Sequence, residues 1–400
     1  MRKSTDHILT SHAGSLPRTP ELIAANAAKE SGDVAHFDEL LTASVIDLVE
    51  RQKAIGIDVP GDGEYGKSMS SAVDYGAWWS YSFDRVSGLE IDPVAAWALE
   101  QKLSTPGNPR LTGFVHRRDR KKFSEAYADP ESGIFTGGPK PFPKVVGKLE
   151  YTGQAAINSD IANLKAGLDS AGYSEGFITS LSPGSASRIT NDYYGSEEEY
   201  IWAWADVLRE EYRAIIDAGL VLQIDDPSIS ENFDQIEPEP SVEDYLKFTR
   251  IRVEALNYAL RDLPEEQIRF HLCWGSWHGP HTTDFELKYL VDLMLEIRAG
   301  AYSFEAANVR HEHEWRVWED NKLPEGKLII PGIVSHATNV VEHPELVADR
   351  IERFAGLVGR ENIIAATDCG LGGRIHPQIA VAKLETLVAG ARIASERLYK

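Results

Sequence analysis

Cysteine is scarce in this chain, and long apolar runs are absent. Two cysteines occur in 400 residues, so at most one disulfide could form. In a large intracellular chain, metal binding or catalysis is the better interpretation of such a pair. No apolar run approaches the ~18 residues of a transmembrane helix, and no hydrophobic core of a signal peptide follows Met1. We therefore expect a cytoplasmic protein that does not enter the membrane.

Positive charge is also in short supply. The chain has 41 Lys and Arg against 62 Asp and Glu, a formal net charge of −21. Because binding to a phosphate backbone depends on a basic surface, this balance argues against a nucleic-acid partner. One basic run, residues 116–122, departs from the trend. It predicts either a solvated helix or loop face or an anion-binding lid.

A dinucleotide-binding Gly-x-Gly-x-x-Gly is missing after the first predicted strand. Instead, a short apolar run, a polar loop and an amphipathic helix recur about every 30 to 45 residues, as in βα units of a parallel sheet. This pattern predicts an α/β fold, a (β/α)8 TIM barrel, formed by residues 1–400 as one catalytic domain. The predicted strands are 57–62, 144–152, 176–182, 220–225, 268–273, 301–306, 328–334 and 362–368.

Residues 66–142 interrupt this rhythm. The segment is too long for an ordinary barrel loop, and we interpret it as an insertion after the first barrel strand that forms a lid over the active-site end. The N-terminal segment 8–17 is expected to precede the barrel proper and to pack near its mouth.

Four potential metal ligands lie at predicted strand ends. His271 and Cys273 are two residues apart, so their side chains leave the same face of the fifth strand. Glu305 ends the sixth strand and Cys369 the eighth, and catalytic groups of a TIM barrel come from the C-terminal ends of its strands. One imidazole, two thiolates and one carboxylate form a soft set that suits Zn²⁺.

The charge of this set indicates the chemistry. Around Zn²⁺ the four ligands sum to about −1, and the sum is unchanged if an incoming thiol loses its proton and replaces Glu305. Zinc sites that activate water more often use nitrogen and oxygen ligands. The soft set therefore favours alkylation of a small thiol, and its carboxylate argues against a purely structural zinc site.

Several motifs together resemble the C-terminal catalytic domain of cobalamin-independent methionine synthase, a barrel of the methionine synthase/uroporphyrinogen decarboxylase type. They are Gly14-Ser15-Leu16-Pro17, Gly61-Asp62-Gly63-Glu64, Leu222-Gln223-Ile224-Asp225-Asp226-Pro227, His271-x-Cys273, Phe304-Glu305 and Asp368-Cys369-Gly370-Leu371. The decarboxylases share the barrel without needing zinc, so the His-x-Cys…Glu…Cys set favours the synthase.

The resemblance implies roles for individual residues. His271, Cys273, Glu305 and Cys369 would hold zinc, and a homocysteine thiolate would take the methyl group of a methyl-folate. Ser15 would contact the homocysteine carboxylate, whereas Glu64 and Asp225 would hold its amine. His336 would be the proton donor, although an ungapped match places it one position early.

The sequence does not identify the alkyl donor. The chain lacks the second barrel that helps the full-length synthase to bind folate, and a shorter branch of the superfamily includes epoxyalkane:coenzyme M transferase. Transfer of a methyl or other alkyl group to a thiol and epoxide opening by a thiol are therefore both open. The expected partners are a small thiol and an alkyl donor, with homo-oligomer formation possible.

Overall fold

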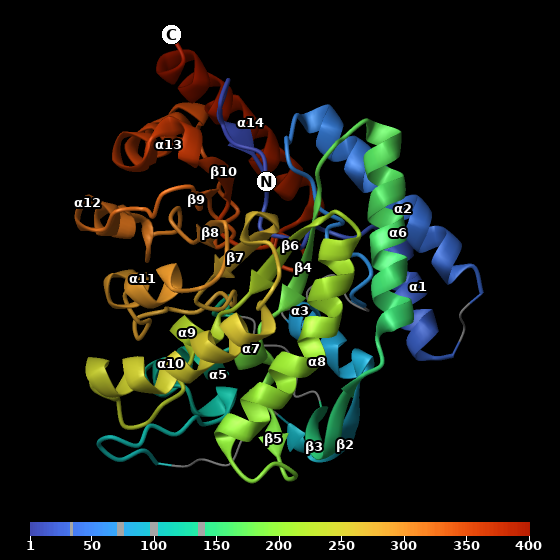
Figure 1. Ribbon diagram of the computed structural model, residues 1–400, viewed down its shortest axis with the longest axis vertical. Coiled ribbons are helices and arrows are strands. Elements are labelled where there is room, and N and C mark those ends of the chain that lie inside the picture. The colour runs from blue at the N-terminus through green and yellow to red at the C-terminus, as the bar shows by residue number, and fades with distance from the viewer. Residues whose placement is uncertain (33–34, 70–75, 97–102, 135–140) are drawn as a thin grey trace.

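Seven parallel strands form the central sheet of the protein. The computed structural model describes residues 1–32, 35–69, 76–96, 103–134 and 141–400. The sheet runs in the order β1-β10-β9-β8-β7-β6-β4 and curls around a central axis (Figure 1). Its strands are β1 (Leu9–Thr10), β4 (Phe177–Leu181), β6 (Val221–Asp225), β7 (Ile268–Leu272), β8 (Ala301–Phe304), β9 (Leu328–Val334) and β10 (Ile364–Thr367).

Residues 58–61 close the gap between β1 and β4. The backbone N–H groups of Asp58 and Val59 donate to Thr10 O at 3.1 and 3.0 Å, and Phe177 N donates to Pro60 O at 3.0 Å. Gly61 forms a parallel bridge with Phe177, and a Cβ on Gly61 would stand 2.7 Å from the Phe177 ring. With this segment the barrel has eight strand positions, which confirms the predicted (β/α)8 fold.

Two strand predictions are wrong in detail. Residues 144–152 do not enter the barrel: β3 (Pro141–Tyr151) pairs antiparallel with β2 (Val86–Ala96) and parallel with β5 (Thr190–Asn191) in a separate sheet. The first barrel strand is β1 rather than 57–62, because Leu9 and Thr10 pair with Ile364 and Ala365 of β10. An apolar run does not reveal its partner, and a two-residue strand leaves no periodic signal.

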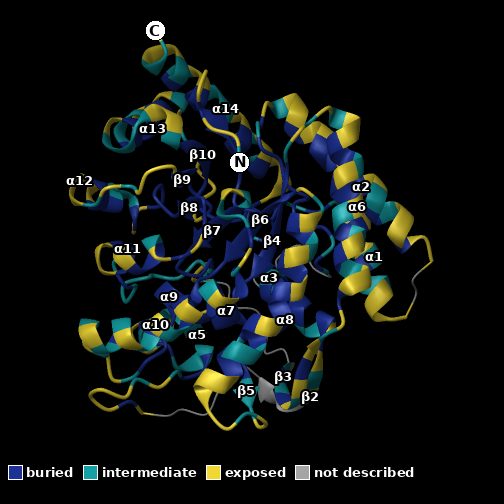
Figure 2. Ribbon diagram, in the orientation of Figure 1, coloured by how far each residue is buried: buried dark blue, intermediate teal, exposed yellow. Residues whose placement is uncertain are grey.

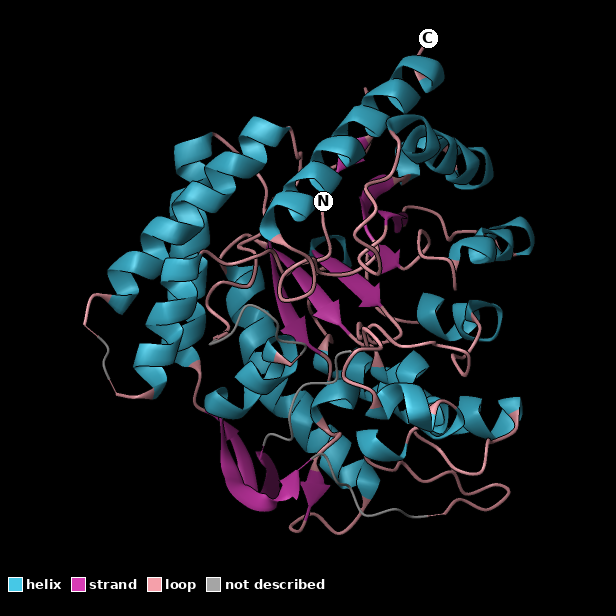
Figure 3. Cartoon of the chain, turned by 180° about the vertical axis from the view of Figure 1, so that it is seen from behind, coloured by secondary structure: helices cyan, strands magenta, loops and turns pink. Residues whose placement is uncertain are grey.

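Long helices surround the barrel (Figures 1 and 3). They are α2 (Phe37–Ile55), α6 (Gln154–Ala171), α8 (Glu197–Asp217), α10 (Val242–Ala259), α11 (Leu287–Leu295), α13 (Pro344–Val358) and α14 (Pro377–Leu398), with α1 (Pro20–Glu30) beside α2. The shorter helices are α3 (Ala77–Ser80), α4 (Arg118–Lys122), α5 (Ser124–Ala128), α7 (Pro183–Ala186), α9 (Ser228–Glu231) and α12 (Val317–Asp320). No helix among the described residues is both long and apolar enough to cross a membrane.

Helix α8 shows how the sequence sets this outer layer. Ser196 caps it, with its hydroxyl accepting a hydrogen bond from Glu199 N at 3.1 Å, and three glutamates occupy the first turn, where the helix dipole favours negative charge. Its buried side chains recur at helical spacing toward the barrel, as at Tyr200, Trp204 and Leu208. Figure 2 shows the same division, with buried residues along the strands and inner helix faces.

Ion pairs hold the segment 66–142 against the barrel. Arg117 pairs with Glu231, and the adjoining Arg118 and Lys121 pair with the acids at positions 239 and 237. Three of the five Lys and Arg residues of the basic run are thus paired with acids of the chain itself, an arrangement that neither sequence-based alternative described. Parts of the segment (70–75, 97–102 and 135–140) lie outside the described residues, and its role as a lid stays a prediction.

Candidate functional site

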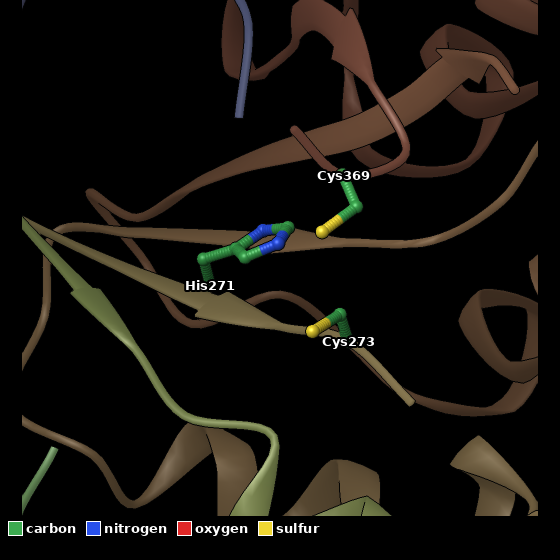
Figure 4. Close-up of side chains that lie close together, drawn as sticks. All are labelled: His271, Cys273 and Cys369. Atoms are coloured by element: carbon green, nitrogen blue, oxygen red, sulfur yellow. The ribbon is translucent and has the colours of Figure 1, made fainter. Parts of the chain in front are cut away.

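Three of the four predicted zinc ligands meet at the C-terminal end of the barrel. His271 lies on β7, Cys273 directly follows that strand, and Cys369 follows β10 (Figure 4). One ligand atom from each lies within 4.8 Å of the others, and all three residues are buried. The two-residue period of a strand puts His271 and Cys273 on one face, as the sequence predicts.

The two ring nitrogens of His271 differ in their hydrogen bonding. Nδ1 lies 2.9 Å from Ser303 Oγ on β8, which sets the ring orientation. Nε2 is buried and has no hydrogen-bond partner among the described residues. Buried nitrogen atoms are rarely left without a partner, so this orphan beside two sulfurs fits a metal ligand whose second nitrogen holds the ring in place.

The pKa values of the two thiols are shifted in opposite directions. A hydrogen bond between the thiols, together with burial, raises the pKa of Cys273 well above its usual value. The same bond lowers the pKa of Cys369, which burial alone would raise, and His271 and Arg374 lower it further. Ser276 Oγ donates to Cys369 Sγ at 2.9 Å. Two sulfurs and a free imidazole nitrogen therefore form a donor set that fits Zn²⁺, which binds deprotonated thiols.

Glu305, the fourth predicted ligand, belongs to a neighbouring group. Its carboxylate accepts hydrogen bonds from Trp274 N at 3.0 Å and from Asn308 Nδ2 at 2.7 Å. A carboxylate oxygen of Glu305 lies within 4.8 Å of ligand atoms of His336 and Asp368. Burial raises the pKa of Glu305 to about 8. Its role as a zinc ligand stays a prediction.

His336 is fully enclosed in this second group. Its Nδ1 has no hydrogen-bond partner among the described residues, and burial lowers its pKa to about 3, so the ring is neutral at pH 7. Asp368, which the sequence analysis did not assign a role, accepts from the backbone N–H groups of Ala306 and Ala307 at 2.7 and 2.8 Å. In the sequence, the position of Asp368 next to the predicted ligand Cys369 could have indicated that it lies at the site.

One pocket joins the predicted substrate residues to the three ligands. Ser15, Glu64 and Asp225 line it together with His271, Cys273 and Cys369. The structure thus gathers residues that lie far apart in the sequence and were assigned to one site. The pocket is also lined by Ala13, Trp78, Pro227, Gly275, Ser276, Gly370 and Arg374. Of these, Trp78 lies on the short helix α3 and Arg374 on the loop after β10, and neither segment has a periodicity that marks a side chain as facing a site.

Glu64 and Asp225 occupy different electrostatic settings. Glu64 accepts from Thr179 Oγ1 at 2.6 Å and from Lys67 Nζ at 3.2 Å. Burial would raise the pKa of Glu64, but Lys67 and Thr179 outweigh it and lower the pKa. Asp225 accepts from Gln223 Nε2 at 2.6 Å, and burial raises its pKa to about 7. Lys67 thus favours the ionised form of Glu64 and partly offsets its charge, whereas burial disfavours ionisation of Asp225.

A chain of buried ion pairs braces the loops above the ligands. His311 bridges Asp284 (3.0 Å) and Glu314 (2.8 Å), and Asp284 also contacts His281 at 3.0 Å. The indole of Trp274 stacks on His311 with 3.9 Å between ring centroids. These contacts fix the loop that follows Cys273 against the loop that follows β8.

Comparison with known proteins identifies the family. A family model described as the catalytic domain of cobalamin-independent synthase matches residues 155–393. A methionine synthase of Sulfurisphaera tokodaii is 22% identical over 396 residues, covering 97% of this chain and 93% of that protein. A 2-hydroxypropyl-CoM lyase of Xanthobacter autotrophicus is 24% identical over 425 residues, covering 98% and 96%.

A solved structure agrees with the barrel fold. The B12-independent methionine synthase of a Shewanella species, in complex with selenomethionine, matches with a TM-score of 0.68 at 19% identity, covering 98% of this chain and 99% of that one. The resemblance found in the sequence motifs is thereby confirmed. Since the family model spans more than half of the chain, this protein belongs to the cobalamin-independent synthase family, matched through its catalytic domain.

Proposed function

We propose that the protein transfers a methyl or other alkyl group to a small thiol in a zinc-dependent reaction. The observation that carries this proposal is the convergence of His271, Cys273 and Cys369 in a pocket that is also lined by Glu64 and Asp225. Soft ligands leave a bound sulfur nucleophilic, and the carboxylates suit the ammonium group of an amino-acid thiol. The family match and the methionine synthase relatives support the same reaction class.

The zinc ion would be held by His271 Nε2 and the sulfurs of Cys273 and Cys369, with Glu305 as the fourth ligand. When bound, it would lower the pKa of an incoming thiol so that the thiol reacts as a thiolate at neutral pH. Ser15 contacts the carboxylate of the thiol, and Glu64 and Asp225 hold its amine.

Glu305 has the properties needed to make way for that thiol. Its pKa of about 8 in the buried site lets the carboxylate take up a proton near neutral pH. Trp274 N and Asn308 Nδ2 already donate hydrogen bonds to its two carboxylate oxygens. The thiol sulfur then forms its bond to the alkyl carbon as the bond to the leaving group breaks. The leaving group departs with the electron pair and takes up the proton that the thiol has given to Glu305; the neutral His336, which has a ring nitrogen within 4.8 Å of a Glu305 carboxylate oxygen, would relay it.

Epoxide opening by a thiol is the second candidate. The alignment with the 2-hydroxypropyl-CoM lyase covers 98% of this chain at 24% sequence identity, against 97% at 22% for the Sulfurisphaera methionine synthase. Both candidates use the same thiol activation and differ in the alkyl donor. A screen of methyl donors and epoxides against the thiol that binds best separates them.

Metal analysis of the purified protein tests the proposal. We expect one equivalent of zinc, and zinc-edge X-ray absorption with homocysteine or 2-mercaptoethanesulfonate should show a third sulfur ligand. A metal-free protein that is fully active would contradict the proposal. If zinc only braced the barrel, Glu305→Gln would leave thiol transfer intact; the exposed Glu319→Gln on α12 serves as the matched control.

A further inference from the structure

Arg374 is a cationic side chain in a pocket otherwise rich in acids and sulfur. We propose that Arg374 joins Ser15 in an anion subsite that binds the carboxylate of the amino-acid thiol and so determines which thiols are accepted. The inference rests on the proposed function, because that function supplies the thiol as the occupant of the pocket. It adds a specificity-determining residue on the loop that follows Cys369.

The loop after β10 places Arg374 and Ser15 around one point. A Cβ on Gly370 would stand 2.9 Å from Ser15 Cβ, 3.2 Å from Ser15 N and 3.4 Å from Arg374 Nη1. Ser15 is held there because Leu371 N and Gly372 N both donate to its carbonyl oxygen, at 2.8 and 3.0 Å. Because Gly370 has no side chain, Ser15 and the Arg374 guanidinium can both approach its backbone closely, and the Ser15 hydroxyl accepts a hydrogen bond from Arg18 Nη1 at 3.2 Å.

The guanidinium is oriented by the backbone. Arg374 Nε donates to Ser276 O at 3.0 Å, and Nη1 donates to Gly370 O at 3.1 Å. Ser276 in turn donates its hydroxyl proton to Cys369 Sγ at 2.9 Å. The planar fork of an arginine matches a carboxylate better than the point charge of a lysine does. Arg374 is therefore positioned relative to the sulfur site before a ligand arrives.

The charges around the pocket match a zwitterion. Among the described residues that line it, Arg374 is the one Lys or Arg side chain, and Glu64 and Asp225 are the two acids. The chain carries a net charge of −21, so an anionic group needs a local cation to offset the surrounding negative potential. An amino-acid thiol would match the pocket at three points. Its carboxylate would face Arg374, its amine would face the two acids, and its sulfur would face the histidine and the two cysteines.

Calorimetric titration with three thioethers tests the subsite without any alkyl donor. Methionine carries both charged groups, 3-(methylthio)propylamine lacks the carboxylate, and 4-(methylthio)butanoate lacks the amine. In Arg374→Gln we expect the affinity for methionine and for the butanoate to fall about 10- to 100-fold, as for a lost charged hydrogen bond. Binding of the propylamine should stay unchanged, and Arg374→Lys should recover part of the loss.

Two further variants sharpen the experiment. Glu64→Gln should show the opposite selectivity, weakening methionine and the propylamine but not the butanoate. Arg310→Gln, which alters an exposed arginine on the loop after β8, should change none of the three affinities. An equal loss for all three thioethers in Arg374→Gln, or an unchanged affinity for methionine, would overturn the proposal.

The same experiment separates this inference from the proposed function. The proposed function would be contradicted, and the subsite supported, if the protein held no zinc and transferred no alkyl group but still bound methionine in an Arg374-dependent way. The subsite alone would be contradicted if the protein alkylated homocysteine but Arg374→Gln did not change its preference for ligands that carry a carboxylate.

Discussion

The pocket is built from two regions of the chain that differ in regularity. Residues 155–393, which match the family model, carry His271, Cys273 and Cys369 at the ends of barrel strands. The part before residue 155 contributes Ser15 and Glu64 from irregular segments and Trp78 from the four-residue helix α3. The regular region holds the groups that would act on sulfur, together with Asp225 and Arg374, and the irregular region adds Ser15 and Glu64, which would contact the charged groups of the thiol. Substitutions in the two regions should therefore have different effects.

The largest effect is expected in the regular region. Cys369→Ser and Cys273→Ser each remove a soft ligand, and we expect zinc to be lost and thiol alkylation to fall about 1,000-fold or more. Zinc content and alkylation rate are measured on the same preparation. The Ser303→Ala variant, which removes only the hydroxyl beside His271 Nδ1, should cost about 10- to 100-fold in metal affinity. Retention of zinc by both cysteine variants would contradict the ligand assignment.

Substitutions in the irregular region should separate thiol binding from metal binding. In Glu64→Gln we expect a full zinc content but an affinity for amino-acid thiols about 10- to 100-fold weaker, because a charged hydrogen bond to the amine is lost. Zinc analysis and zinc-edge titration with homocysteine provide the two measurements. If zinc were lost together with the thiol, the division between the two regions would not hold.

The docking of the segment 66–142 should affect stability more than chemistry. Arg117 and Glu231 are both buried, and Arg117→Met leaves that carboxylate with Arg188 as its remaining partner. We expect the free energy of unfolding to fall by about 3 kcal/mol, with the zinc content unchanged at low temperature. Denaturant unfolding provides the measurement. The exposed Lys122→Met should cost under ~1 kcal/mol, and a similar loss in both variants would count against the docking role.

His12 should make the irregular region sensitive to acid. Burial lowers the pKa of His12 to about 3; in the unfolded chain it is about 6.5. Between these values the unfolded state binds a proton that the folded state does not, so the free energy of unfolding falls as the pH falls. This group contributes up to about 1.4 kcal/mol per pH unit. His12→Gln should reduce that slope between pH 6 and 4, whereas His313→Gln, at an exposed site, should not.

The sequence predicts the regular region better than the irregular one, for physical reasons. His271 and Cys273 could be placed on one face because a strand has a period of two, and the barrel rule places Cys369 at the same end. Trp78, on the four-residue helix α3, and Arg374, on a loop within the family-matched residues 155–393, could not be found in this way, because the conformation of such segments depends on contacts with distant residues. The short β1 and the separate strand β3 were misplaced because pairing partners are not encoded locally.

Pairing of β1 with β10 makes the order of synthesis matter. Leu9 and Thr10 must wait for Ile364 and Ala365 before the barrel can close, and Ser15 O must wait for the N–H groups of Leu371 and Gly372. On the ribosome, a growing chain can form helices and neighbouring strand pairs early, but contacts of such long sequence separation form late. Residues 9–15 therefore reach their final neighbours late, and the thiol pocket is completed only after residues 364–372 have emerged.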